Sequence, residues 1–125
     1  MNRWNIPLWL EGEVIDRDKK CVYCRTEMID RVPKGSSRSK AATWEHIIND
    51  ETLVTRENIA RCCSSCNSSK GTKDLSVWMN SKYCKQHGIT EDTVADGVKN
   101  ALRKQLHKIS SDNSGIVVKS LNHYL

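Results

Sequence analysis

The sequence has no phenylalanine, and only 38% of its 125 residues are hydrophobic. A core built from so few apolar side chains is modest, and small domains with thin cores often recruit a metal ion. No apolar run approaches the length of a transmembrane helix. The short apolar stretch at residues 6–10 meets Glu11 at once, so no secretion signal is expected there. We therefore expect a cytoplasmic protein with no membrane partner.

Internal repeats and linker-like shifts in composition are also missing. The length suits one domain, so we expect a single domain over residues 1–125. Acidic residues are outnumbered, 15 against 20 lysines and arginines, which gives a formal net charge of +5. This charge gives mild support to a polyanionic partner and is equally typical of a generic basic protein.

Cysteine, by contrast, is plentiful and patterned. Four of the six cysteines form two C-x-x-C pairs. Four thiolates in two such knuckles suit a tetrahedral structural zinc, whose site is closed to substrate. In a reducing cytosol, metal ligands explain the pairs better than disulfides do. The predicted zinc ligands are Cys21, Cys24, Cys63 and Cys66. Cys62 could replace Cys63, but the spacing favours Cys63, and Cys62 is predicted to be a buried thiol.

Apolar spacing and breaking residues predict the elements in chain order. A helix capped by Asn5 precedes the first knuckle, and a polar loop follows over residues 25–42. Strands at 43–48 and 58–62 flank a long loop, and a helix follows the last knuckle. A packed helix from Leu75 to near Gly88, a last helix starting at Thr90 and a final strand at 116–118 complete the prediction. The polar loop carries four cations that either are solvated or contact phosphates: Arg31, Lys34, Arg38 and Lys40.

The stretch from Trp44 to Gly71 combines further signals. Glu45-His46 lies on the first predicted strand, Asn58 begins the second, and Asn67 directly follows the last cysteine. With both C-x-x-C pairs, this order of strand, long loop, strand and helix resembles the HNH nucleases, zinc-supported members of the ββα-metal fold. The resemblance covers about residues 6–75. It implies an α+β fold with a ββα-metal core, two zinc knuckles, an N-terminal helix and a helical C-terminal extension over about residues 76–125.

The resemblance also implies a role for each matching residue. His46 is the general base that activates water, and Glu45 before it ligates a catalytic divalent cation. Asn67 is the second protein ligand of that cation, whereas Asn58 pins the loop and helps to orient His46. The implied cofactors are a structural Zn²⁺ and a catalytic Mg²⁺ or Mn²⁺.

Phosphodiester hydrolysis needs a general base and a cation that stabilises charge on the phosphate, and these residue types can supply a base and cation ligands. An imidazole titrates near neutral pH and can take a proton from water. Mg²⁺ prefers oxygen ligands and keeps positions for water and phosphate, so Glu45 and Asn67 leave room for a substrate. Neighbouring strand residues point to opposite faces, so Glu45 and His46 can serve one phosphate only where the strand bends or frays. Lys70 and Lys73, which follow Asn67, either contact phosphate or are solvated.

Two departures from the family pattern matter. The family more often has aspartate at the position of Glu45, and its glycines after the histidine are replaced here by Asn49, Asp50 and Glu51. Asp50 or Glu51 could therefore compete as the metal ligand, although we favour Glu45.

The sequence thus predicts a metal-dependent endonuclease that hydrolyses DNA, with double-stranded DNA as the expected substrate. The main rival is a non-catalytic, zinc-stabilised DNA-binding or adaptor module, because zinc knuckles serve that use too. An RNA-directed nuclease or a toxin domain is a third reading. One active site per chain needs two chains or two visits to break both strands, so a homodimer is among the expectations.

Overall fold

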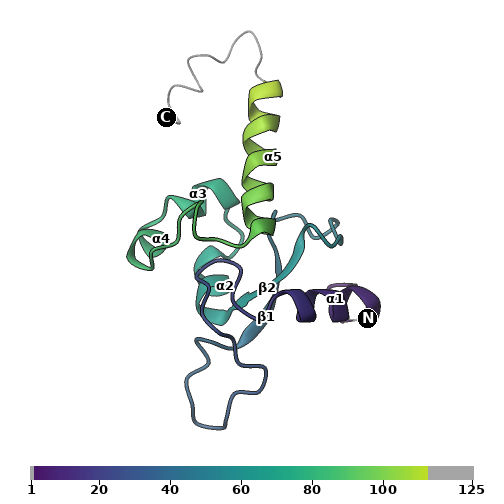
Figure 1. Cartoon of the computed structure of the whole chain (residues 1–125), viewed down its shortest axis with the longest axis vertical. Coiled ribbons are helices and arrows are strands. Elements are labelled where there is room, and N and C mark those ends of the chain that lie inside the picture. The colour runs from purple at the N-terminus through teal and green to yellow at the C-terminus, as the bar shows by residue number, and fades with distance from the viewer. Residues whose placement is uncertain (1, 113–125) are drawn as a thin grey trace.

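The computed structural model describes the backbone of residues 2–112 and the side chains of residues 2–105. Within this range the chain is a mixed α/β structure with one two-stranded antiparallel sheet and five helices (Figure 1). In chain order the elements are α1 (Leu8–Arg17), β1 (Ala42–His46), β2 (Ile59–Cys63), α2 (Ser64–Lys70), α3 (Leu75–Met79), α4 (Lys82–Gln86) and α5 (Asp96–Asp112). None of the helices in the described part is long and apolar enough to cross a membrane.

The register of the sheet decides which side chains share a face. His46 pairs with Ile59, and Glu45 pairs with Ala60. Because directly opposed residues of antiparallel strands point to the same face, His46 and Ile59 lie on one face and Glu45 and Ala60 on the other. Neighbouring positions along β1 therefore deliver their side chains to two different environments.

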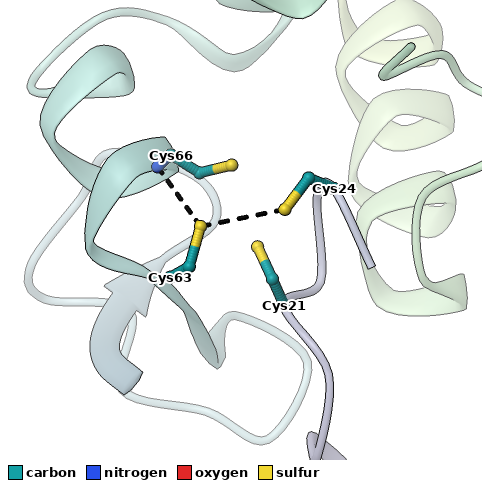
Figure 2. A group of neighbouring side chains, drawn as sticks. All are labelled: Cys21, Cys24, Cys63 and Cys66. Carbon is teal, nitrogen blue, oxygen red and sulfur yellow. Dashed lines mark hydrogen bonds between the residues drawn. The ribbon is translucent and has the colours of Figure 1, made fainter. Parts of the chain in front are cut away.

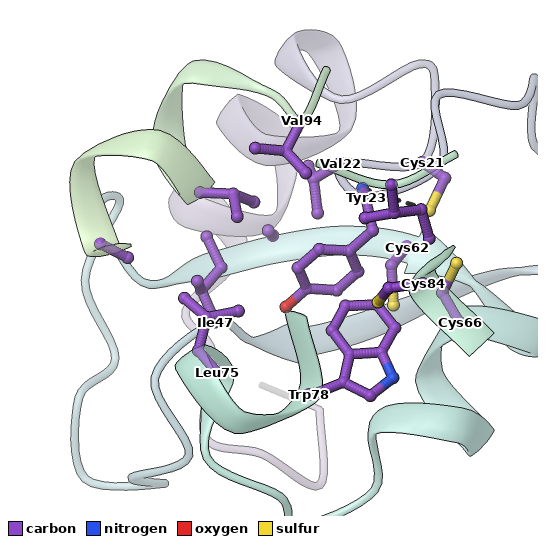
Figure 3. Packing of buried hydrophobic residues seen from close by; sticks show 14 of the residues in the cluster. Cys21, Val22, Tyr23, Ile47, Cys62, Cys66, Leu75, Trp78, Cys84 and Val94 are labelled. Carbon is purple, nitrogen blue, oxygen red and sulfur yellow. Dashed lines mark hydrogen bonds between the residues drawn. The ribbon is translucent and has the colours of Figure 1, made fainter. Parts of the chain in front are cut away.

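The larger core covers the face that carries Glu45. Tyr23 and Trp78 lie at its centre, both fully buried, with ring centroids 4.8 Å apart in an edge-to-face arrangement (Figure 3). Ile47 from the end of β1 and Leu75 from α3 pack in the same cluster. Large aromatic pairs bury much apolar area and add about 0.5–1.5 kcal/mol beyond it, which helps a core that has no phenylalanine.

A smaller cluster covers the opposite face. Ile6, Leu10 and Val14 recur every four residues and are fully buried together with Ile59 of β2. This spacing places the three side chains on one stripe of the N-terminal segment and helix α1. Helix α1 therefore closes the face of the sheet on which His46 lies.

The predicted start of the first helix is wrong. Helix α1 begins at Leu8, its N-cap is Pro7 in an extended conformation, and Asn5 adopts a positive φ of 60°. The residue before a proline is kept out of the helical region, so the helix can start only after Ile6.

The predicted helix from Leu75 to Gly88 is two short helices, because the Ser81 side chain accepts a hydrogen bond from the backbone N–H of Cys84 and starts α4 anew. Val77, expected in the packed stripe, is 63% exposed. The last helix begins at Asp96 rather than Thr90, since Thr90 and Thr93 hydrogen-bond within a turn of their own. The predicted strand at 116–118 lies outside the described residues.

Candidate functional site

The four cysteines of the two C-x-x-C pairs come together, as predicted from their spacing. Their sulfur atoms all lie within 4.8 Å of one another, at the junction of the first knuckle with β2 and α2 (Figure 2). The Sγ atoms of Cys24 and Cys63 are 3.8 Å apart. A regular tetrahedron of sulfurs with metal–sulfur bonds of about 2.3 Å has edges of about 3.8 Å. The cluster could therefore hold one tetrahedral metal ion.

Donors around the sulfurs support thiolate ligands. The backbone N–H of Tyr23 donates to Cys21 Sγ at 3.4 Å, and that of Cys66 donates to Cys63 Sγ at 3.5 Å. The Tyr83 hydroxyl donates to Cys66 Sγ at 3.3 Å. Hydrogen bonds from these donors offset negative charge on the sulfurs and fix their direction, as outer-shell groups do in metal sites.

The ambiguity between Cys62 and Cys63 is settled by the faces of β2. Cys63 joins the cluster, whereas Cys62 is fully buried in the larger core with its sulfur 3.6 Å from Thr43 Oγ1. Burial raises the pKa of the Cys62 thiol well above its usual value. Cys62 is therefore a buried thiol, as predicted.

Glu45 occupies a buried ionic network. Its Oε2 accepts a 2.5 Å hydrogen bond from the Tyr23 hydroxyl and lies 3.0 Å from Lys70 Nζ. The side chains of Glu45 and Lys70 are only 7% and 1% exposed. Lys70 Nζ also donates to the backbone oxygen of His46 at 3.3 Å. A buried charge with two partners is satisfied, so one oxygen of Glu45 is already occupied.

The burial of Lys70 contradicts both sequence interpretations of that residue, which were a phosphate contact and a solvated lysine. A signal for it was present, because Cys66 and Lys70 are one helical turn apart on α2 and share a face. If Cys66 faces the metal cluster and the core, Lys70 must face inward as well. The sequence analysis also missed Tyr23, which directly follows the buried Cys21–Val22 pair and supplies the other hydrogen bond to Glu45.

His46 is the last residue of β1, and its partly buried imidazole lies on the α1 face. The indole of Trp4 meets it edge to face, with ring centroids 5.6 Å apart. Its Nε2 is buried and has no hydrogen-bond partner among the described residues. Burial lowers the pKa of His46, mainly by disfavouring the charged form. The fold therefore favours the neutral form of the imidazole over the charged form.

Asn58 pins the loop that joins β1 to β2. Its Oδ1 accepts from the backbone N–H of Ile48 at 2.7 Å, while its Nδ2 donates to the carbonyls of Ile48 and Leu53, both at 3.1 Å. The residue is 5% exposed, and its own carbonyl accepts from Ile47 N. One side chain thus fixes the chain immediately after His46, consistent with its expected pinning role.

Asn67 and Glu45 are the expected ligands of a catalytic cation, and their chemistry fits one in type. Asn67 Nδ2 donates to Thr43 Oγ1 at 2.8 Å and to the backbone oxygen of Trp44 at 3.1 Å, which leaves its Oδ1 free to act as an acceptor or ligand. Glu45 Oε1 makes no hydrogen bond within the described residues. Both are hard oxygens of the kind that Mg²⁺ prefers. The ammonium of Lys70 beside Glu45 works against a second cation at that carboxylate.

The acids after His46 lie near the imidazole. Asp50 and Glu51 both act electrostatically on the pKa of His46, alongside Glu45 and Lys70. Asp50 Oδ1 accepts from the N–H and the hydroxyl of Thr52, which lowers the pKa of Asp50 and keeps it ionised. The carboxylate of Asp50 is therefore a candidate metal ligand near His46, in addition to the oxygens of Glu45 and Asn67.

The arrangement combines a metal-binding scaffold with a neutral, unpartnered histidine at the end of a strand whose continuation is clamped by an asparagine. Such a histidine is chemically competent to accept a proton at its free nitrogen near neutral pH. Comparison with models of protein families, with curated proteins and with solved structures gives no match to this chain.

Proposed function

We propose that this protein is a metal-dependent endonuclease of the HNH type that hydrolyses phosphodiester bonds in double-stranded DNA. The observation that carries the proposal is His46, a partly exposed imidazole at the end of β1 whose pKa is lowered by burial, so that its neutral, proton-accepting form is favoured. The four-cysteine cluster, the paired strands and the helix that follows them support an HNH core, and the cluster supports a structural zinc.

In this mechanism His46 accepts a proton from the attacking water on its imidazole, whose neutral form is favoured by burial. Trp4 limits the positions that the ring can adopt, and the hydrogen bond from Lys70 to the backbone oxygen of His46 fixes the end of the strand. Asn58 keeps Ile48, two residues after His46, in place through two hydrogen bonds. A general base held in this way contributes about 10²–10⁴-fold to a rate.

Glu45 and Asn67 would hold the catalytic Mg²⁺ or Mn²⁺, which when bound supplies positive charge for the phosphoryl oxygens and the leaving oxygen. Asn67 contributes its Oδ1, because its amide nitrogen is engaged by Thr43 and Trp44. Glu45 contributes its Oε1, because Tyr23 and Lys70 engage Oε2. The strand ends at His46, so base and ligand act from its two sides.

The test is cleavage of a supercoiled plasmid by the purified protein with Mg²⁺ or Mn²⁺, with His46→Ala as the matched inactive control. We expect conversion to nicked or linear DNA by the wild type alone. Absence of cleavage in both metals, with plasmids of several sequences, would contradict the proposal. If an RNA substrate is cleaved faster than the plasmid under the same conditions, the protein is an RNA-directed nuclease instead.

Metal rescue separates the ligands. If Glu45 and Asn67 hold the cation, Glu45→Gln and Asn67→Ala lose activity at low Mn²⁺ and regain part of it as Mn²⁺ is raised, whereas His46→Ala does not. If Asp50→Asn shows the rescue and Glu45→Gln does not, the ligand is on the His46 side of the strand.

A second candidate is a zinc-stabilised DNA-binding module without activity. The observation that favours it is the ion pair of Glu45 with the buried Lys70, which neutralises the carboxylate that a cation would need. The plasmid assay decides between the two, because a module binds the duplex without cutting it.

A further inference from the structure

The segment of residues 31–40, called the basic loop below, is a mostly exposed stretch that carries charge of one sign only. It contains four cations, Arg31, Lys34, Arg38 and Lys40, and no aspartate or glutamate. All four side chains belong to exposed residues. None of them takes part in a salt bridge within the described residues, where the ion pairs involve other cations.

The basic loop is held at its base rather than hanging free. Ile29 and Ala42 bracket it, with hydrogen bonds from Ile29 N to Lys40 O at 2.9 Å and from Ala42 N to Ile29 O at 3.0 Å. Within the loop, the N–H of Ser36 donates to Pro33 O, and Gly35 takes a φ of +85° that a side chain would strain. The loop projects away from the rest of the chain at the bottom of Figure 1.

The base of the loop is also tied to the helix that carries Asn67. Ser64 N donates to Ala41 O at 2.9 Å, and Ser65 N donates to Ser39 O at 3.1 Å. The first turn of α2 is therefore hydrogen-bonded to the end of the loop. The loop therefore has a fixed place at the start of β1, and His46 lies at the end of the same strand. Four residue steps of a strand span about 13 Å.

A double helix presents about one phosphate charge per 1.7 Å of its axis, so a stretch of about 13 Å carries several phosphates. A duplex that reaches His46 can therefore present other phosphates to the basic loop. Exposed cations without salt-bridge partners, on a loop with a fixed position, can bind the phosphates of such a backbone. Contacts of this kind do not depend on the base sequence.

We propose that the basic loop is a contact surface for the phosphate backbone of duplex DNA and positions the duplex along β1. This inference takes duplex DNA as the substrate from the proposed function. It adds the surface that would hold the duplex. Recognition through the loop is independent of base sequence and strongly dependent on salt.

The experiment measures binding of a labelled 30-base-pair duplex by fluorescence anisotropy at several salt concentrations, without added Mg²⁺ or Mn²⁺ so that no cleavage occurs and without a chelator, because a chelator would also remove zinc from the cysteine cluster. The test variant carries Arg31→Gln, Lys34→Gln, Arg38→Gln and Lys40→Gln. The matched control removes the same number of exposed cations elsewhere, with Lys82→Gln, Lys85→Gln, Arg103→Gln and Lys104→Gln. Circular dichroism and bound zinc per chain establish that both variants are folded.

We expect the slope of log affinity against log salt to fall by roughly two to four in the loop variant, at about 0.9 for each lost phosphate contact. The two half variants, Arg31→Gln with Lys34→Gln and Arg38→Gln with Lys40→Gln, should each lose about half of that. The control should keep most of the wild-type slope. A loop variant with the wild-type slope, or a control that loses as much, would overturn the proposal.

The outcome is separable from that of the proposed function. Loss of binding in the loop variant, in a protein that never cuts plasmid, supports the surface and contradicts the nuclease. Cleavage by the wild type together with unchanged binding by the loop variant supports the nuclease and contradicts the surface.

Discussion

On the face of the sheet that looks toward Trp78, polar groups have partners. Glu45 is paired with Lys70 and Tyr23, and Asn67 donates two hydrogen bonds to β1. On the α1 face, by contrast, His46 presents a buried nitrogen with no partner within the described residues. The two residues are neighbours on one strand, yet one is satisfied and the other is not.

The difference separates stability from reactivity. A buried polar group that is fully paired supports the fold, and removing one partner is costly because the other is left desolvated. A buried nitrogen without a partner costs free energy in the folded state, so removing it should not destabilise the fold through lost hydrogen bonds. We therefore expect substitutions on the metal and Glu45 side to act mainly on folding, and substitution of His46 to act mainly on chemistry.

The largest effect is expected from the cysteine cluster. If the cluster holds zinc as proposed, Cys63→Ala removes one of four ligands, and structural zinc sites in small domains contribute about 10–16 kcal/mol at pH 7. This exceeds or equals the whole stability of a typical domain, so the variant should be unfolded by circular dichroism and should not retain zinc. The matched control is its neighbour: Cys62→Ala should keep the metal and lose only about 1–2 kcal/mol from a small cavity. A Cys63→Ala protein that is still folded would show that the cysteine cluster is not needed for the stability of the fold.

The next effect concerns the buried ion pair. Lys70→Met leaves the Glu45 carboxylate buried without its cation, and breaking such a pair costs about 3–5 kcal/mol. Urea unfolding should show this loss, and the double variant Glu45→Gln with Lys70→Met should recover part of it, since no buried charge remains. Equal stability of the single and double variants would indicate that Glu45 does not depend on Lys70.

A smaller loss is expected at the loop between the strands. Asn58→Ala removes three hydrogen bonds and leaves the backbone groups of Ile48 with fewer partners, for a loss of about 2–3 kcal/mol in unfolding free energy. In the proposed enzyme the rate should fall as well, because the chain after His46 is released. Asn49→Ala, which removes one exposed hydrogen bond to Thr72, is the control and should change little.

The smallest effect on stability is expected for His46→Ala at neutral pH, and it should accompany a loss of about 10²–10⁴-fold in cleavage. Its pH dependence has a definite sign. Burial lowers the pKa of His46 below 6.5 in the folded state, so below pH 6.5 the unfolded chain binds the proton more readily and wild-type stability falls. His46→Ala should lack this part of the fall. Near-normal cleavage by His46→Ala would place the reactive group elsewhere.

The features that depend on residues close together in the sequence could be predicted from it. The spacing of the four cysteines was sufficient to predict the cluster, and the strands predicted at 43–48 and 58–62 lie within one or two residues of β1 and β2. These features depend on short repeats of residue type along the chain. Alternation along β1 also predicted that Glu45 and His46 would face opposite ways, and the register agrees.

What the sequence could not supply depends on contacts between distant segments. The partner of Glu45 is Tyr23, 22 positions away, and neither residue indicates the other. The break between α3 and α4 depends on one serine that caps a new helix in preference to extending the old one. The burial of His46 Nε2 without a partner depends on contacts with N-terminal residues such as Trp4, and no pattern on β1 encodes those contacts.

The cysteine cluster has a consequence for the order of folding. Cys24 and Cys63 are 39 positions apart; β1 lies between them, and β2 ends at Cys63. Closing a loop of that length costs about 3 kcal/mol in chain entropy, and one bound ion would meet this cost before either strand has paired. Strand pairing then takes place inside a closed ring of chain. Refolding followed by tryptophan fluorescence should therefore accelerate with zinc concentration until loading saturates, so that the supply of the ion, rather than the sheet itself, sets the pace at which a new chain matures.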